Sequence, residues 1–265
     1  MNAPFLKWAG GKRWLADSAS LPMPEKFDRY IEPFVGGGAV FFRLAPERAV
    51  LSDINQELIN LYRVMRDSPA RLEWLIHLHQ GKHSTQYYYE MRATIPFCPI
   101  AQAARILYLN RTCWNGLYRV NLRGEFNVPI GTKTAVVMEG ESFSDLSDAL
   151  SKAEIICQDF EWTLQSVGKG DFVFVDPPYT VKHNLNGFLK YNENIFGWSD
   201  QLRLHRAIVA AADRGASIVV TNADHESVRE LYAGFEYRRL ARTSVLAGDA
   251  AKRGKTSEAM FLLNL

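Results

Sequence analysis

The most specific chemical signal is a four-residue stretch at 176–179, which directly follows an apolar run at 172–175. Its residues are Asp176, Pro177, Pro178 and Tyr179. Proline fixes its own φ and has no N–H, so the pair makes the backbone rigid and leaves the preceding carbonyls free as acceptors. The Asp176 carboxylate and the Pro177 carbonyl can then both accept N–H bonds from one planar amino group, while the Tyr179 ring can stack on a base.

This arrangement suits transfer of a methyl group to an exocyclic amine. Such an amine is a poor nucleophile when it is conjugated to a purine. Two acceptors that hold its hydrogens localise the lone pair, and the nitrogen can then attack a sulfonium methyl in line. The protein would contribute orientation and electrostatics rather than a covalent intermediate. The structural alternative is a strand that merely ends in a Pro-Pro turn, and the motifs upstream argue against it.

Three consecutive glycines at 36–38 come after an apolar pair at 30–31 and open a helical pattern. Glycines permit a tight turn and let a ligand approach the backbone, and a helix start offers free N–H groups. A dinucleotide fingerprint would have a further glycine at position 41, where Phe41 stands, so pyrophosphate binding is disfavoured. Lys12 follows two glycines, but the P-loop spacing and its Ser or Thr are missing, which disfavours a triphosphatase.

Asp53 follows an apolar run at 49–51 and therefore falls beside the glycine turn in an α/β topology. A carboxylate in that place can accept two hydrogen bonds from ribose hydroxyls. The alternative role is an N-cap for the helix that starts near Asn55. Both readings stay open on the sequence alone.

The elements that would position these residues alternate between strands and helices. Ser199 to Arg214 has helical spacing and ends before Gly215. The expected buried strands contain 30–31, 49–51, 154–157, 172–175 and 217–220, and 237–246 with 258–263 would close the sheet as an antiparallel pair. This alternation predicts an α/β fold with a parallel sheet, whose ligands bind beyond the carboxyl ends of the strands.

The segment from 57 to about 140 breaks that rhythm. It starts with a helical pattern, is rich in aromatic residues and arginine, and contains a hairpin signal with its turn near Arg123-Gly124. We therefore expect a catalytic domain in two parts, 1–56 and 145–265, and a helical and hairpin insertion at 57–144.

Composition narrows the class of protein further. The chain has 265 residues, 47% hydrophobic, with no apolar run near the roughly 20 residues that span a bilayer. No signal-peptide core follows the N-terminal charges, so we expect a soluble, cytoplasmic protein. The three cysteines have no CxxC spacing and the six histidines are scattered, so no metal site is expected.

Net charge is only +2, but basic residues cluster locally. Five stand against one acidic residue between 105 and 133, and six against one between 238 and 255. Two basic zones in a near-neutral chain suggest a footprint for a polyanion. A solvated charged face is the equally open alternative.

The order of these motifs, with Phe5 to Lys12 before them, resembles the Dam-type (alpha-class) DNA adenine-N6 methyltransferases over nearly the whole chain. The resemblance implies a Rossmann-like methyltransferase sheet with an inserted helical and β-hairpin DNA-recognition domain. It also implies S-adenosylmethionine as cofactor and double-stranded DNA as partner. We expect a monomer, because a base-flipping enzyme of this size needs no second subunit. The cofactor-binding residues that the resemblance implies are Trp8, Lys12, Glu32, Phe34, Gly36, Gly38, Asp53, Asp159, Phe160 and Asp176. Asp176 and Tyr179 would hold a flipped adenine.

Residues 110–121 resemble the family's target-recognition hairpin. Arg119 can pair with guanine O6 and N7 in the major groove, and Trp114 can wedge into the base stack. Flipping is required because adenine N6 is paired inside the duplex. The DNA-binding residues that the resemblance implies are Lys7, Arg111, Trp114, Asn115, Leu117, Arg119 and Pro129. The family more often has Tyr at position 114, whereas Leu117 and Arg119 match, so GATC is the expected target from resemblance only.

Several alternatives remain. Trp114 could be a core aromatic and Arg119 a surface ion-pair partner. A cytosine-N4 enzyme usually has Ser in place of Asp176 and a protein-glutamine enzyme usually has Asn, so Asp176 favours adenine. RNA is a less favoured substrate because no separate RNA-binding module is visible. A different class is a catalytically silent DNA-binding protein of the same fold. We also expect the loop at 192–194 to close over the adenine, and 242–255 to meet phosphates.

Overall fold

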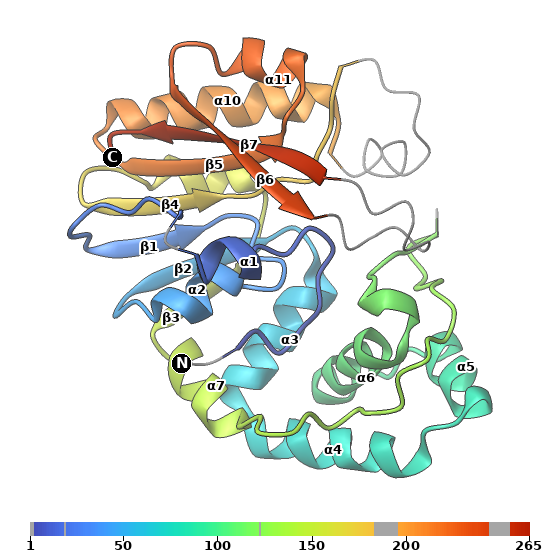
Figure 1. Ribbon diagram of the computed structural model, residues 1–265. Coiled ribbons are helices and arrows are strands. Elements are labelled where there is room, and N and C mark those ends of the chain that lie inside the picture. The colour runs from blue at the N-terminus through green and yellow to red at the C-terminus, as the bar shows by residue number, and fades with distance from the viewer. Residues whose placement is uncertain (1–2, 19, 122, 183–195, 244–254) are drawn as a thin grey trace. The chain divides into compact units, whose positions relative to one another are not determined.

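The computed structural model describes residues 3–18, 20–121, 123–182, 196–243 and 255–265 (Figure 1). The chain falls into two compact units. Unit 1 comprises Met1–Leu21 and Val35–Cys157, and unit 2 comprises Pro22–Phe34 and Gln158–Leu265. Both units mix helices and strands, so the expected α/β class is confirmed. Within the described residues, no helix combines the length and apolar character that a membrane span requires.

Unit 1 is mainly helical, with one pair of strands. Its elements are α1 (Arg13–Ala16), α2 (Ala39–Leu44), β2 (Ala49–Asp53), α3 (Gln56–Asp67), α4 (Pro69–Lys82), α5 (Thr85–Ala93), α6 (Pro99–Thr112), the 3-10 helix η1 (Trp114–Gly116), α7 (Phe143–Leu150) and β3 (Ala153–Cys157). Strands β2 and β3 are parallel, with Ala49 opposite Ala153 and Asp53 opposite Cys157. Both were expected as strands from their apolar runs.

The helices of unit 1 start where local chemistry favours a start. Asn55 caps α3 by accepting from the Leu58 N–H at 3.1 Å. Pro69 and Pro99 occupy the first turns of α4 and α6, where a missing N–H costs nothing. The apolar face of α3 packs against α6 and α7, and α6 is buried from residue 103 to residue 112. Helix α6 is thus the centre of this unit's core.

Unit 2 contains a sheet that is parallel except at one edge. Its elements are β1 (Arg29–Glu32), α8 (Phe160–Gln165), β4 (Asp171–Val175), α10 (Trp198–Asp213), β5 (Ser217–Ala223), α11 (Glu226–Leu231), β6 (Glu236–Thr243) and β7 (Lys255–Leu263). Strands β1, β4 and β5 are parallel, and β7 lies antiparallel between β5 and β6. All five residues of β4 are buried. The expected parallel strands, the helix near 199–214 and the closing antiparallel pair are confirmed; residues 244–246 lie outside the described residues.

The chain reversal expected near Arg123-Gly124 is also present. An antiparallel bridge joins Val120 and Phe126, and the Asn121 N–H donates to the Glu125 carbonyl at 2.9 Å. Gly124 has φ +78, a conformation that favours glycine. Whether residues 57–144 act as a DNA-recognition domain stays a prediction.

Candidate functional site

The glycine turn of unit 1 has no room for side chains. Gly36 and Gly38 both have positive φ, at 45° and 63°. A Cβ on Gly36 would lie 2.7 Å from Cδ1 of Trp8, and one on Gly38 would lie 2.7 Å from the hydroxyl oxygen of Tyr62. The Tyr62 hydroxyl also donates to the Gly36 carbonyl at 3.1 Å. Only glycine fits either position, as the spacing of the motif predicted.

Asp53 ends β2 beside this turn. Its Oδ2 accepts from the Gly36 N–H at 3.3 Å and its Oδ1 from the Asn55 N–H at 3.0 Å. Burial raises the pKa of Asp53 to about 6, although these backbone donors oppose the shift. Asn55, and not Asp53, caps α3, so the capping alternative for Asp53 is wrong. The two backbone donors instead orient the Asp53 carboxylate, whose oxygens have lone pairs for further donors.

An aromatic pair lies next to the turn. The Trp8 ring stacks on the Tyr118 ring with centroids 5.1 Å apart and planes 22° apart. The Tyr118 hydroxyl donates to Oε2 of Glu57 at 2.6 Å. Lys12 is buried and its Nζ donates to the Gly10 carbonyl at 2.7 Å. The sequence singled out Trp8 and Lys12 but missed Tyr118 and Glu57, because no spacing rule links positions so far apart.

Asn110 joins the N-terminal motif to the segment expected to read DNA. Its buried amide accepts from the Lys7 N–H at 3.1 Å and donates to the Lys7 carbonyl at 2.8 Å. The same amide donates to the Gly116 carbonyl at 3.2 Å. A Cβ on Gly116 would meet Cβ of Lys7 at 2.7 Å, so the two segments are in direct contact. Lys133 and partial burial lower the pKa of Lys7, because a second ammonium nearby disfavours charge.

Most residues expected to touch DNA lie at the surface of unit 1. Trp114 is 44% exposed, which argues against the core-aromatic alternative. Asn115 is exposed with φ 55, and Arg119 is exposed and donates to Oδ1 of Asn127 at 2.8 Å. Leu117 is half-buried, and Lys7 and Pro129 are exposed.

Arg111 differs from this group because it is buried. Its guanidinium donates to the Val136 carbonyl at 2.7 Å, to the Phe5 carbonyl at 3.2 Å and to Oε1 of Glu141 at 2.5 Å. Only 2% of its side chain is exposed. This geometry argues against a direct DNA contact. Arg111 instead joins α6 to the segment that contains Val136 and Glu141.

The Asp-Pro-Pro-Tyr stretch belongs to unit 2 and leaves β4 directly. Oδ1 of Asp176 accepts from the Thr221 hydroxyl of the neighbouring strand β5 at 2.7 Å. The Tyr179 hydroxyl donates to Oε2 of Glu258 on β7 at 2.7 Å. Pro177 is buried, and Pro178 is half-buried. Sequence analysis identified the stretch as a candidate site. It did not identify Thr221 or Glu258, which form hydrogen bonds with Asp176 and Tyr179.

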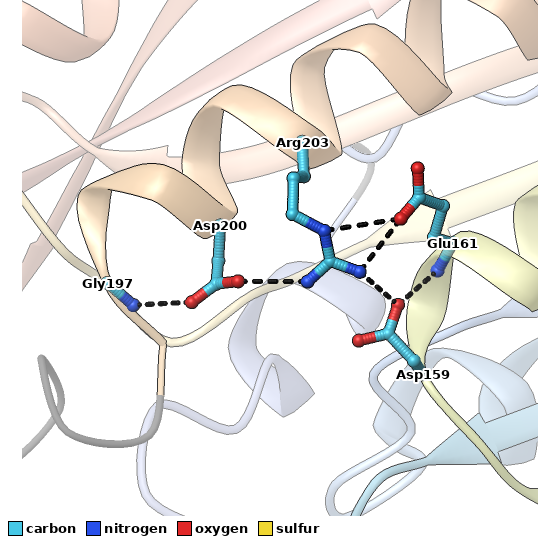
Figure 2. Close-up of polar contacts among 5 residues, drawn as sticks. All are labelled: Asp159, Glu161, Gly197, Asp200 and Arg203. Atoms are coloured by element: carbon cyan, nitrogen blue, oxygen red, sulfur yellow. Dashed lines mark hydrogen bonds and ion pairs between the residues drawn. The ribbon is translucent and has the colours of Figure 1, made fainter.

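A second cluster of candidate residues in unit 2 surrounds Asp159 and Phe160. Figure 2 shows Arg203 of α10 directed toward the carboxylates of Asp159, Glu161 and Asp200. The Phe160 ring stacks on Phe34 with centroids 5.3 Å apart. Glu32 is buried and accepts from the Tyr30 hydroxyl at 2.9 Å. The sequence did not single out Arg203.

The part of the chain that the structure describes contains no cluster of three or more His, Cys, Asp or Glu residues suited to a metal ion.

Comparison with known proteins gives a consistent family. Residues 8–245 match the family described as D12 class N6 adenine-specific DNA methyltransferase. The Type II methyltransferase M1.LlaDCHI of Lactococcus lactis subsp. cremoris is 37% identical, covering 96% of this chain and 93% of that protein. The Type II methyltransferase M.MjaIII of Methanocaldococcus jannaschii is 32% identical, covering 95% and 96%. The DNA adenine methylase of Haemophilus influenzae is 33% identical, covering 97% and 92%.

Proposed function

The chain belongs to the D12 class of N6 adenine-specific DNA methyltransferases, and we propose that it methylates adenine N6 in duplex DNA, at GATC, with S-adenosylmethionine as the methyl donor. The observation that carries this proposal is the oriented acceptor at the end of β4. Asp176 is held by Thr221, and two prolines fix the backbone that follows. Such a rigid acceptor suits an exocyclic amino group.

The residues around the glycine turn fit the cofactor. The turn excludes side chains at Gly36 and Gly38, which leaves the backbone approachable. Asp53 would accept hydrogen bonds from the ribose hydroxyls. When bound, S-adenosylmethionine supplies a sulfonium methyl. We assign cofactor contacts to Trp8, Lys12, Glu32, Phe34, Gly36, Gly38, Asp53, Asp159, Phe160 and Asp176.

Asp176, Pro177, Pro178 and Tyr179 would act on the adenine. The Asp176 carboxylate and the Pro177 carbonyl accept the two amino hydrogens and localise the nitrogen lone pair. The Tyr179 ring stacks on the base, and its hydroxyl, bonded to Glu258, fixes the ring's position. The protein provides preorganised acceptors and excludes competing orientations.

DNA recognition would come from 57–144, with 1–56 and 145–265 as the catalytic parts. Trp114 and Asn115 are exposed, which would leave Trp114 accessible to wedge into a base stack. Arg119 would read a guanine in the major groove, and Lys7, Leu117 and Pro129 would approach the same DNA. The GATC target rests on Leu117 and Arg119, and the protein would act as a monomer. Residues 192–194 and 244–254, expected to meet the adenine and phosphates, lie outside the described residues.

The test is methyl transfer from labelled S-adenosylmethionine to unmethylated duplex DNA, with products digested to nucleosides and sites mapped. N6-methyladenine confined to GATC supports both reaction and target. N6-methyladenine at another sequence keeps the chemistry and overturns the target. If cofactor and DNA both bind and no base is methylated, the protein is a catalytically silent DNA-binding member of the family.

A further inference from the structure

Arg203 links three acidic side chains from two helices of unit 2. Its Nη2 donates to Oδ1 of Asp159 at 2.9 Å and to Oε2 of Glu161 at 2.8 Å, and its Nη1 donates to Oδ1 of Asp200 at 2.9 Å. Asp200 in turn accepts from the Gly197 N–H at 2.9 Å, at the start of α10. Figure 2 shows the guanidinium between these carboxylates. Asp200, on the same helix, therefore helps to orient the Arg203 guanidinium toward Asp159.

The contacts on Asp159 are one-sided. Its Oδ1 accepts from Arg203 and also from the Glu161 N–H at 2.9 Å, which caps α8. Among the described residues, no donor reaches its Oδ2. Two donors on one oxygen prevent the carboxylate from rotating, so the other oxygen is presented as an acceptor in a fixed direction.

Arg203 also contacts the ring of Phe160. The guanidinium carbon lies 4.9 Å from the centre of the Phe160 ring, within the range of a cation–π contact. That ring packs on Phe34. Arg203 thus contacts two neighbouring residues assigned to the cofactor, one through hydrogen bonds and one through its planar face.

The local charge favours an N–H donor as the ligand of Asp159. One guanidinium faces three carboxylates, so the cluster retains net negative charge. An anion or a carbonyl oxygen would be repelled, whereas an amino group can donate to the fixed oxygen. S-adenosylmethionine carries two such donors, the α-ammonium and the 6-amino group of the adenine, and the aromatic rings of Phe160 and Phe34 next to Asp159 favour the planar adenine.

We propose that Arg203 is a positioning residue that aims Asp159 at the 6-amino group of the cofactor's adenine and so gives the enzyme its preference for adenine over a 6-oxo purine. This inference rests on the proposed function, because it requires Asp159 to contact the cofactor. A 6-oxo purine presents an oxygen acceptor where adenine presents a donor, and a fixed carboxylate oxygen disfavours it.

Equilibrium binding to the full chain tests the inference without catalysis. The two probes are S-adenosylhomocysteine and S-inosylhomocysteine, its deaminated counterpart, measured by calorimetry. We expect the wild type to prefer the adenine probe by at least tenfold, the scale of one hydrogen bond to a charged group. Arg203→Met should bring the two dissociation constants together, mainly by weakening the binding of S-adenosylhomocysteine. Arg203→Lys, which keeps the charge but not the planar fork, should retain part of the preference.

Two further variants separate positioning from general destabilisation. Arg206→Met removes an exposed arginine one turn later on α10 and should leave the preference unchanged. Asp159→Asn should reduce the preference, and adding Arg203→Met to it should cause no further reduction, because both act through one carboxylate. Circular dichroism verifies that each variant is folded.

The outcomes are distinct. If the wild type discriminates and folded Arg203→Met and Arg203→Lys retain full preference, Arg203 has no positioning role. If Arg203→Met reduces the preference equally with and without Asp159→Asn, the effect does not pass through Asp159 and the inference is overturned. If the wild type binds neither probe, the proposed cofactor itself is wrong.

Discussion

The hydroxyl of Thr221 on β5 donates to Oδ1 of Asp176, the residue that follows β4, at 2.7 Å. The two strands are parallel neighbours, with Val175 opposite Val220. The acceptor in the Asp-Pro-Pro-Tyr stretch is therefore oriented by a side chain from the next strand. The proline pair fixes the backbone, and Thr221 fixes the carboxylate.

Removing this orientation should slow methyl transfer without weakening DNA binding. Thr221→Val keeps the shape of the side chain but not the hydroxyl, and we expect kcat to fall about 10- to 100-fold, a typical loss for a misplaced reacting group. Asp176→Ala should abolish transfer while the Kd for DNA stays within about twofold, since it removes an acceptor for the base rather than a duplex contact. Single-turnover kinetics and DNA binding assays measure the two effects.

Thr221→Ser is the matched control for that pair. It retains a hydroxyl on β5 and should keep most of the activity. Full activity in Thr221→Val, or measurable turnover in Asp176→Ala, would contradict the assigned role of the carboxylate.

Cofactor affinity should depend on pH through Asp53. Burial raises its pKa to about 6, and ribose hydroxyls donate to the ionised carboxylate. Affinity should therefore fall as pH drops below about 6, by up to tenfold per unit. Titration with S-adenosylhomocysteine between pH 5 and 8 measures this, with Asp53→Asn as a weak and pH-independent reference. An affinity that is constant over this range would exclude Asp53 from the contact.

The same pKa shift has the opposite effect on folding stability. A carboxyl group whose pKa is raised in the folded state takes up a proton more readily there than in the unfolded chain, so its contribution is most favourable below pH 4. That contribution is lost as pH rises through about 6. Asp53→Asn, which imitates the neutral form, should raise the free energy of unfolding at pH 8 by about 1–3 kcal/mol and change it little at pH 4. Urea melts at the two values test the sign.

Gly36→Ala should damage the turn of unit 1. Its Cβ would lie 2.7 Å from Trp8, and the left-handed backbone at φ 45 costs a residue with a Cβ about 1–2 kcal/mol. We expect a lower melting temperature and at least tenfold weaker cofactor binding, because Trp8 must move. Gly81→Ala in α4, where nothing lies within 4 Å of the new Cβ, is the control and should be neutral or stabilising. Unchanged cofactor affinity in Gly36→Ala would place the cofactor elsewhere.

Arg119→Ala should relax sequence preference more than it weakens total DNA binding. A bidentate contact to guanine contributes roughly 1–3 kcal/mol of discrimination, so variant sites should be methylated closer to the rate of the preferred one. Arg123→Ala, an exposed arginine beside the turn at Gly124, is the matched comparison. Methylation rates on a library of duplexes distinguish the two. An equal loss on every sequence would identify Arg119 as a phosphate contact.

Local patterns predicted the strands and the longest helix of unit 2. The Phe-Val-Phe-Val run became β4, and the apolar spacing after Ser199 became α10. Both succeed because burial of one face dominates these elements. The turn at the consecutive glycines was also predictable, because residues other than glycine rarely adopt a positive φ.

Pairings between distant residues could not be predicted in this way. Asp159 and Arg203 are 44 positions apart, and Asn110 and Lys7 are 103 apart. No single-sequence periodicity encodes such partners, because they arise only when helices pack. Arg111 is an example. Its place in the motif predicted a contact with DNA, whereas its ion pair with Glu141 lies in the interior.

The order of the strands in unit 2 differs from their order along the chain, because β7 follows β6 in the sequence but lies between β5 and β6. Until residue 263 has left the ribosome, β5 and β6 have no partner on their facing edges. Translation adds about 5–20 residues each second, so these edges stay unpaired while the remaining residues are added. Nascent chains should therefore be most prone to edge-to-edge association in this interval, and the late synthesis of β7 should set when the enzyme becomes resistant to proteases.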